Sequence, residues 1–157
     1  MKHIRKTDRN WAIGLVHARK HPAAWWSAAS NANDLIAPVV QFGQDLGVTV
    51  TPFVSEYEPE VAQFIYDGQD AFVVNPATHT LYGETIRSAL VGYGTPFIEV
   101  HALNLSRWLS ERPSRQSHLE SNFSHDATGL VTGMGIYGYY GALLSLVGVL
   151  DDPEYLG

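Results

Sequence analysis

Cysteine is absent from this chain and basic residues are few. Without cysteine there can be no disulfide bond or Cys-ligated metal, and the redox compartment is left unmarked. The net charge of −6, from 10 basic and 16 acidic residues, argues against nucleic acid as a partner, because phosphate contacts need clustered cations. The longest apolar stretch, 142–150, is too short to cross a membrane, and no cleavable leader precedes the first predicted strand. We therefore expect a cytoplasmic protein with no membrane partner.

The length of the chain predicts one domain, residues 1–157, with a single substantial core. Apolar runs that fit strands alternate along it with segments that fit helices. The expected strands are 11–17, 48–54, 71–74, 97–100 and 127–131, and the expected helices are 30–47, one starting near Glu58, 83–91 and 139–150. Residues 18–29 and 101–125 are expected to be irregular. This alternation predicts an α/β fold with parallel strands and helices on both faces.

Ligands of such sheets bind beyond the carboxyl ends of the strands, so the residues there are the first candidates for a site. Glu99 and His101 lie two apart on a predicted strand and should point to the same side. A carboxylate beside an imidazole supports a general acid or base, although a surface Glu and a strand-capping His would look the same. Asn75 ends the preceding strand, where its amide could donate to a substrate oxygen or simply bond the turn at Pro76.

Two other patterns suggest cofactors. Gly133, Gly135 and Gly138 match the G-x-G-x-x-G of dinucleotide-binding folds, but that motif needs a second strand with an acidic residue about 20 positions on. The sequence stops at Gly157, so we expect a structural turn. The seven histidines are scattered without metal-ligand spacing. We expect no metal site, although two or three of these histidines could converge in space.

Three segments, VVNPATHT (73–80), IEVHALN (98–104) and TGMGIYGYYGALLSL (132–146), together resemble the type II 3-dehydroquinate dehydratases, in order and over residues 72–150. The resemblance implies a flavodoxin-like three-layer α/β sandwich with a five-stranded parallel sheet. It also implies a homo-oligomer of trimers that assemble into a dodecamer. The implied reaction is an anti elimination of water from a small molecule, without a cofactor. The glycine motif then becomes the turn between the last strand and the last helix.

The resemblance also implies roles for individual residues. His101 would be the general acid, Glu99 would orient it, and Asn75 would bind substrate or water. Backbone and amide groups of Ala102, Leu103 and Asn104 would hold the substrate carboxylate, and Arg112 or Arg115 would cover the ring. The further residues expected to bind substrate are His17, Arg19, His79 and Tyr82.

The chain departs from the family where a lid tyrosine should remove a proton. The stretch VHARKHPAAWWSAAS (16–30) offers Arg19 but no tyrosine, and two tryptophans, Trp25 and Trp26, take the place of the lid. The family's binding histidine corresponds to Leu81, so His79 comes two residues early, and SEYEPE (55–60) replaces a stretch that normally carries Asn-His-Glu. The residues expected to be available as a replacement base are His17, His79, Tyr57 and Tyr82.

These departures predict a repurposed enzyme of the family, a lyase or hydrolase that uses His–Glu acid–base chemistry on a small cyclic or carboxylate substrate. Loss of a well-placed base costs about 10²–10⁴ in rate, so unchanged chemistry would be slow. A genuine 3-dehydroquinate dehydratase with an unusual lid and a non-catalytic ligand-binding protein are the alternatives.

Overall fold

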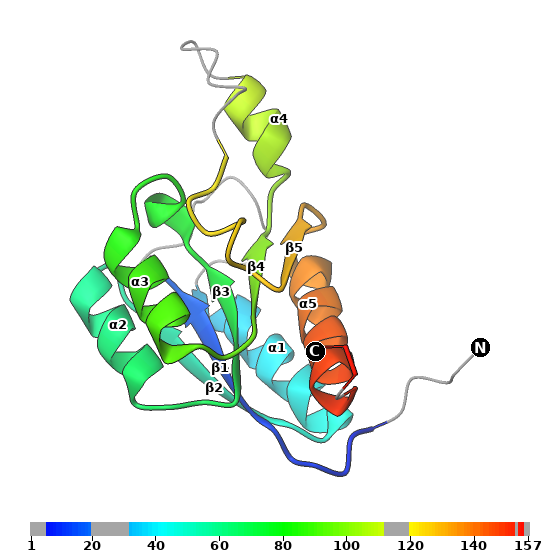
Figure 1. Cartoon of the computed structure of the whole chain (residues 1–157). Helices are drawn as coiled ribbons and strands as arrows, with labels where there is room; N and C mark the ends of the chain where they lie inside the picture. The colour runs from blue at the N-terminus through cyan, green and yellow to red at the C-terminus, as the bar shows by residue number, and fades with distance from the viewer. Residues whose placement is uncertain (1–5, 20–31, 112–119, 153, 156–157) are drawn as a thin grey trace.

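A computed structural model of the chain describes residues 6–19, 32–111, 120–152 and 154–155. Its centre is a parallel sheet with the strand order β2-β1-β3-β4-β5 (Figure 1). The strands are β1 (Ala12–His17), β2 (Thr49–Val54), β3 (Ala71–Asn75), β4 (Phe97–His101) and β5 (Gly129–Thr132). This is the flavodoxin-like order, so the predicted fold class is confirmed.

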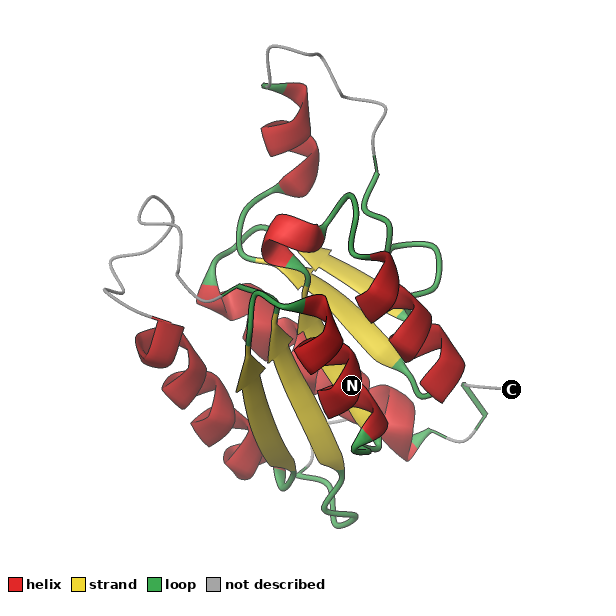
Figure 2. Ribbon diagram, turned by 90° about the vertical axis from the view of Figure 1, so that its left-hand side faces the viewer, coloured by secondary structure: helices red, strands yellow, loops and turns green. Residues whose placement is uncertain are grey.

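Helices cover both faces of the sheet (Figure 2). The helices α1 (Ala32–Leu46) and α5 (Ile136–Asp151) pack on one face, and α2 (Glu58–Tyr66) and α3 (Glu84–Tyr93) pack on the other. Ile13 and Leu15 of β1 therefore point into the first apolar layer and Val16 into the second. Burial on both faces explains why the central strands read as continuous apolar runs. Among the described helices, none has the length and apolar character needed to span a membrane.

The stretch 101–125, which the sequence predicts to be irregular, contains a short helix, α4 (Leu105–Ser110). Asn104 begins it, because its Oδ1 atom accepts a hydrogen bond from the backbone N–H of Arg107 at 3.0 Å. The helix lies beyond the carboxyl end of β4 (Figure 1). Two smaller differences are a 3₁₀ turn, η1 (Ala77–His79), and a last helix that begins three residues before the predicted position 139.

The glycine motif forms the turn from β5 into α5, as expected. Gly133 and Gly135 have φ values of +90° and +56°, a backbone region that side chains with a Cβ atom rarely enter. The backbone N–H of Gly133 donates to the carbonyls of His101 and Leu103, both at 2.9 Å, and that of Gly135 donates to the carbonyl of Ala102 at 2.9 Å. The turn therefore fixes the backbone just after β4.

Candidate active site

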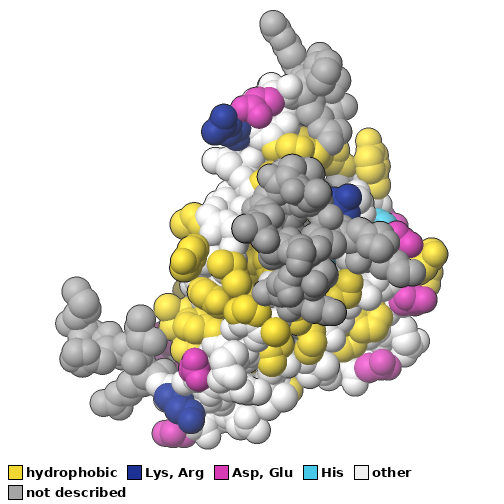
Figure 3. All heavy atoms as spheres, turned by 180° about the vertical axis from the view of Figure 1, so that it is seen from behind, with side chains coloured by type: hydrophobic (Ala, Val, Ile, Leu, Met, Phe, Trp, Pro, Cys, Tyr) yellow, Lys and Arg dark blue, Asp and Glu magenta, His cyan; other side chains and the backbone are white. Residues whose placement is uncertain are grey.

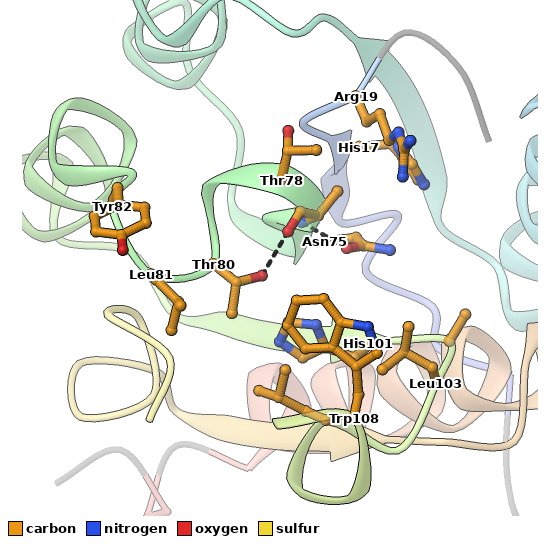
Figure 4. A pocket seen from close by; sticks show the side chains of 13 residues that line it. His17, Arg19, Asn75, Thr78, Thr80, Leu81, Tyr82, His101, Leu103 and Trp108 are labelled. Atoms are coloured by element: carbon orange, nitrogen blue, oxygen red, sulfur yellow. Dashed lines mark hydrogen bonds between the residues drawn. The ribbon is translucent and has the colours of Figure 1, made fainter. Parts of the chain in front are cut away.

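A cavity of about 440 Å³ opens at the carboxyl ends of β1, β3 and β4 (Figure 4). Two turns complete its wall, the one that contains η1 and the one that leads into α4. The lining residues that the sequence predicts are His17, Arg19, Asn75, Tyr82, His101, Ala102 and Leu103. The others are Ala77, Thr78, Thr80, Leu81, Leu105 and Trp108. The predicted edge of the sheet is therefore where the cavity lies.

Glu99 and His101 form a buried hydrogen-bonded pair at this edge. The His101 Nε2 atom lies 2.7 Å from Glu99 Oε1, and the Ser124 hydroxyl donates to Glu99 Oε2 at 2.6 Å. Burial acts to raise the pKa of Glu99, but hydrogen bonds from His101 and neighbouring hydroxyls outweigh it, so the pKa lies below its ordinary value. The ionised carboxylate lies behind the His101 ring and holds it against the cavity. Because Glu99 is completely buried, the alternative of a surface glutamate is wrong.

Asn75 bonds the turn after Pro76, and its second N–H group leaves the substrate role open. Its Oδ1 atom accepts a hydrogen bond from the backbone N–H of Ala77 at 2.9 Å, which fixes the turn after Pro76. Its Nδ2 atom donates to the Tyr139 hydroxyl at 2.6 Å. An amide nitrogen carries two N–H groups, so one donor remains for a ligand in the cavity. Burial raises the pKa of Tyr139 well above its ordinary value, so its hydroxyl stays protonated.

We expect Tyr139→Phe to lower the free energy of unfolding by about 1 kcal/mol, because it removes a partner of the Asn75 amide inside the protein. The substrate KM should rise as well, since Asn75 is held less firmly. Urea unfolding and steady-state kinetics measure the two effects. Tyr140→Phe is the matched control: Tyr140 is on the same helix and packs against Phe42. Equal results for the two variants would contradict a role for this hydrogen bond.

His17 and Arg19 form the opposite side of the cavity from His101. The His17 side chain is only 3% exposed, and its Nδ1 atom has no hydrogen-bond partner in the described part of the chain. Burial lowers the pKa of His17, and the positive charge of Arg19 acts in the same direction against opposing backbone hydrogen bonds. His17 is therefore a neutral imidazole at pH 7.

Among the described residues expected to bind substrate, His79 and Asn104 do not line the cavity. His79 lies outside it, where Nε2 is 2.9 Å from the Glu56 carbonyl oxygen and Nδ1 is 3.7 Å from a Glu58 oxygen. Asn104 is used as the helix cap described above. Tyr82 lies on the rim and is 76% exposed. The remaining expected positions, Arg112, Arg115, Trp25 and Trp26, fall outside the described residues.

No three His, Cys, Asp or Glu side chains among the described residues are close enough together to hold a metal ion. His125, for example, pairs with Glu120 on the surface, at 3.1 Å.

Trp108 and Leu105 line the cavity, although the sequence did not predict either of them as a site residue. Both come from α4, and Trp108 lines the same cavity as His101 (Figure 4). Asn104 followed by LSRWL carried the signal, because an N-cap residue precedes apolar side chains three and four positions apart. Leu105 and Leu109 use that spacing to bury themselves, which leaves Trp108 on the cavity side.

Comparison with known proteins places this chain in a family. The family described as dehydroquinase class II matches residues 22–147. Catabolic 3-dehydroquinase 1 of Aspergillus terreus is 35% identical over 109 residues, which cover 68% of this chain and 68% of that protein. The catabolic 3-dehydroquinase of Sclerotinia sclerotiorum is 34% identical over 114 residues, which cover 69% of this chain and 70% of that protein.

Solved structures that resemble this chain come from the same family. The type II dehydroquinase of Propionibacterium acnes superimposes with a TM-score of 0.66 at 26% identity, covering 88% of this chain and 97% of that one. The type II dehydroquinase of Butyrivibrio crossotus has a TM-score of 0.76 at 22% identity, with coverage of 88% and 98%, and supports the fold alone. The chain therefore belongs to the class II dehydroquinase family, as its three segments predicted, and with that family to the carbon–oxygen lyases.

Proposed function

We propose that this chain dehydrates 3-dehydroquinate. The proposal depends above all on one observation, the Glu99–His101 pair, 2.7 Å apart, whose imidazole faces a cavity of about 440 Å³. Small-molecule sites have volumes of about 300–1,000 Å³. The curated relatives are named catabolic 3-dehydroquinases, which supports the same substrate here. They give no support to a repurposed reaction, so the genuine dehydratase that the sequence left as an alternative is the better conclusion.

The cavity offers a group for each part of the substrate. Removal of a proton next to the ketone gives an enolate, and departure of the hydroxyl group then completes the elimination. His101 would protonate that hydroxyl, with Glu99 holding its ring. The remaining N–H of Asn75 can donate to the enolate oxygen or to a bound water. Arg19 supplies a positive charge at the cavity wall for the substrate carboxylate.

Incubation of the purified protein with 3-dehydroquinate tests the proposal, since the product is a conjugated enone that absorbs in the ultraviolet. We expect kcat within the common enzyme range of about 1–10³ s⁻¹. Mass spectrometry of the same mixture should show the loss of one water. Recovery of all the 3-dehydroquinate unchanged, bound or free, would contradict the proposal and favour the ligand-binding alternative.

We also propose that the chain associates into trimers that build a dodecamer, the assembly that the resemblance implies. Apolar side chains gather on the side of the molecule where α5 lies (Figure 3). Leu130 on the edge strand β5, Met134 in the glycine turn and Tyr137 at the start of α5 are all exposed. Such side chains are typical of surfaces that bury themselves in an interface. Native mass spectrometry should find multiples of three chains, and a monomer would contradict this. The cytoplasmic location stays a prediction.

A further inference from the structure

We propose that His17 is the base that removes the proton next to the substrate ketone, acting across the cavity from His101. This inference rests on the proposed dehydration. It assigns the step for which the sequence offers no lid tyrosine in the usual place.

The strand register places the two histidines on opposite sides of one ligand. His17 ends β1 and lies directly beside Asn75 at the end of β3, and His101 ends β4 on the far side of β3. Neighbouring strands are about 4.8 Å apart, so β1 and β4 are separated by roughly 10 Å, enough for a six-membered ring between the imidazoles. Figure 4 shows His17 with Arg19 on one side of Asn75 and His101 on the other. An anti elimination needs its base and its acid on opposite faces of the ring.

The surroundings of the two histidines suit opposite roles. His101 Nε2 contacts the Glu99 carboxylate, the arrangement that supports a general acid. His17 has the cation Arg19 as its charged neighbour, and its Nδ1 atom is buried without a partner among the described residues. A neutral imidazole on the cavity wall is equipped to accept a proton.

The other candidate bases are less suitable. His79 and Tyr57 do not line the cavity, and both ring nitrogens of His79 already face oxygen atoms of Glu56 and Glu58. Tyr82 lines the rim, and Figure 4 shows it on the far side of the cavity from Arg19. Tyr139 keeps its proton and does not line the cavity, because it is fully buried behind Asn75, whose amide donates to its hydroxyl.

The proposed step is balanced in atoms and electrons. The C–H bond next to the ketone breaks, its proton moves to a ring nitrogen of His17, and the electron pair forms the enolate. The enolate then re-forms the ketone carbonyl, and the electrons of its C=C bond form the new double bond of the product. The C–O bond of the leaving hydroxyl breaks at the same time, and a proton from His101 completes the water molecule. His17 finally releases its proton to solvent and His101 takes one up, which restores both rings.

Substitution of His17 with glutamine tests the proposal, and His79→Gln is the matched control because His79 is a histidine outside the cavity. We expect His17→Gln to lower kcat about 10²–10⁴-fold, the usual contribution of a general base, with little change in KM. The control should keep the wild-type kcat. In His17→Gly, added imidazole should restore part of the rate, which a merely structural histidine would not allow. If His17→Gln keeps more than about one tenth of kcat, the proposal is wrong and the dehydration stands.

Deuterium uptake separates failure of this proposal from failure of the proposed function. If the wild-type protein forms no enone, NMR in heavy water still reports proton removal at the carbon next to the ketone. Uptake that depends on His17 and not on His79 would support His17 as the base while the dehydration fails. Uptake that is absent, or unchanged in His17→Gln, would overturn the His17 assignment.

Discussion

The variant His101→Gln should dehydrate 3-dehydroquinate about 10²–10⁴-fold more slowly than the wild-type protein, because it removes the acid that protonates the leaving hydroxyl. Glutamine is chosen over alanine for a structural reason. Glu99 is completely buried, and loss of its partner would leave an unpaired charge in the interior at a cost of about 3–5 kcal/mol. The glutamine amide can still donate to that carboxylate, so the loss of rate can be measured in a folded protein.

Two further variants test whether the loss of rate is specific to His101. His125→Gln changes a histidine whose side chain is 81% exposed, and it should leave kcat unchanged. Glu99→Gln keeps the volume but removes the charge that holds the imidazole, so we expect a smaller loss than in His101→Gln. Steady-state kinetics and circular dichroism of all three proteins provide the comparison. Full activity in His101→Gln would remove this residue from the mechanism.

Gly138→Ala should lower the free energy of unfolding by about 1–3 kcal/mol, the usual cost of forcing an extra methyl group into a packed site. A Cβ atom at this position would lie 2.9 Å from the carbonyl oxygen of Gly133, a backbone atom that cannot rotate away, and 3.5 Å from a methyl group of Val131. The start of α5 therefore has to separate from the glycine turn. The same shift should raise KM, because that turn bonds the backbone that follows His101.

Gly141→Ala is the matched control, since Gly141 lies one turn further along the same helix and a Cβ atom there meets nothing within 4 Å. Alanine is the better helix former, so this variant should be more stable than the wild type by about 0.5–1 kcal/mol. Urea unfolding of both variants gives the two values. Equal destabilisation would show that the close approach at Gly138 is not the cause.

Local patterns in the sequence were sufficient to predict the strands of the sheet and the Glu99–His101 pair. Glu99 and His101 could be placed together because the two-residue period of a strand is a local property. The partners that complete the site come from far along the chain. Ser124 reaches Glu99 across 25 positions, and Tyr139 reaches Asn75 across 64, through packing that no short pattern records.

Short helices and turns account for the other predictions that differ from the structure. The six residues of α4 are fewer than two turns, too short for a clear helical period, so Trp108 was not foreseen on the cavity wall. His79 belongs to the expected Thr-His-Thr cluster, yet η1 turns it toward the carbonyl of Glu56 and away from the cavity. The order of the residues alone does not show whether the His79 side chain points toward the cavity or away from it.

The hydrogen bond from Asn75 to Tyr139 has a consequence for genetics. It ties Asn75 in the cavity wall to the interior of α5, none of whose residues line that cavity. A random mutagenesis screen for inactive enzyme should therefore return many hits within α5. Suppressors of those hits should cluster where α5 meets α1, the layer that holds the tyrosine in place.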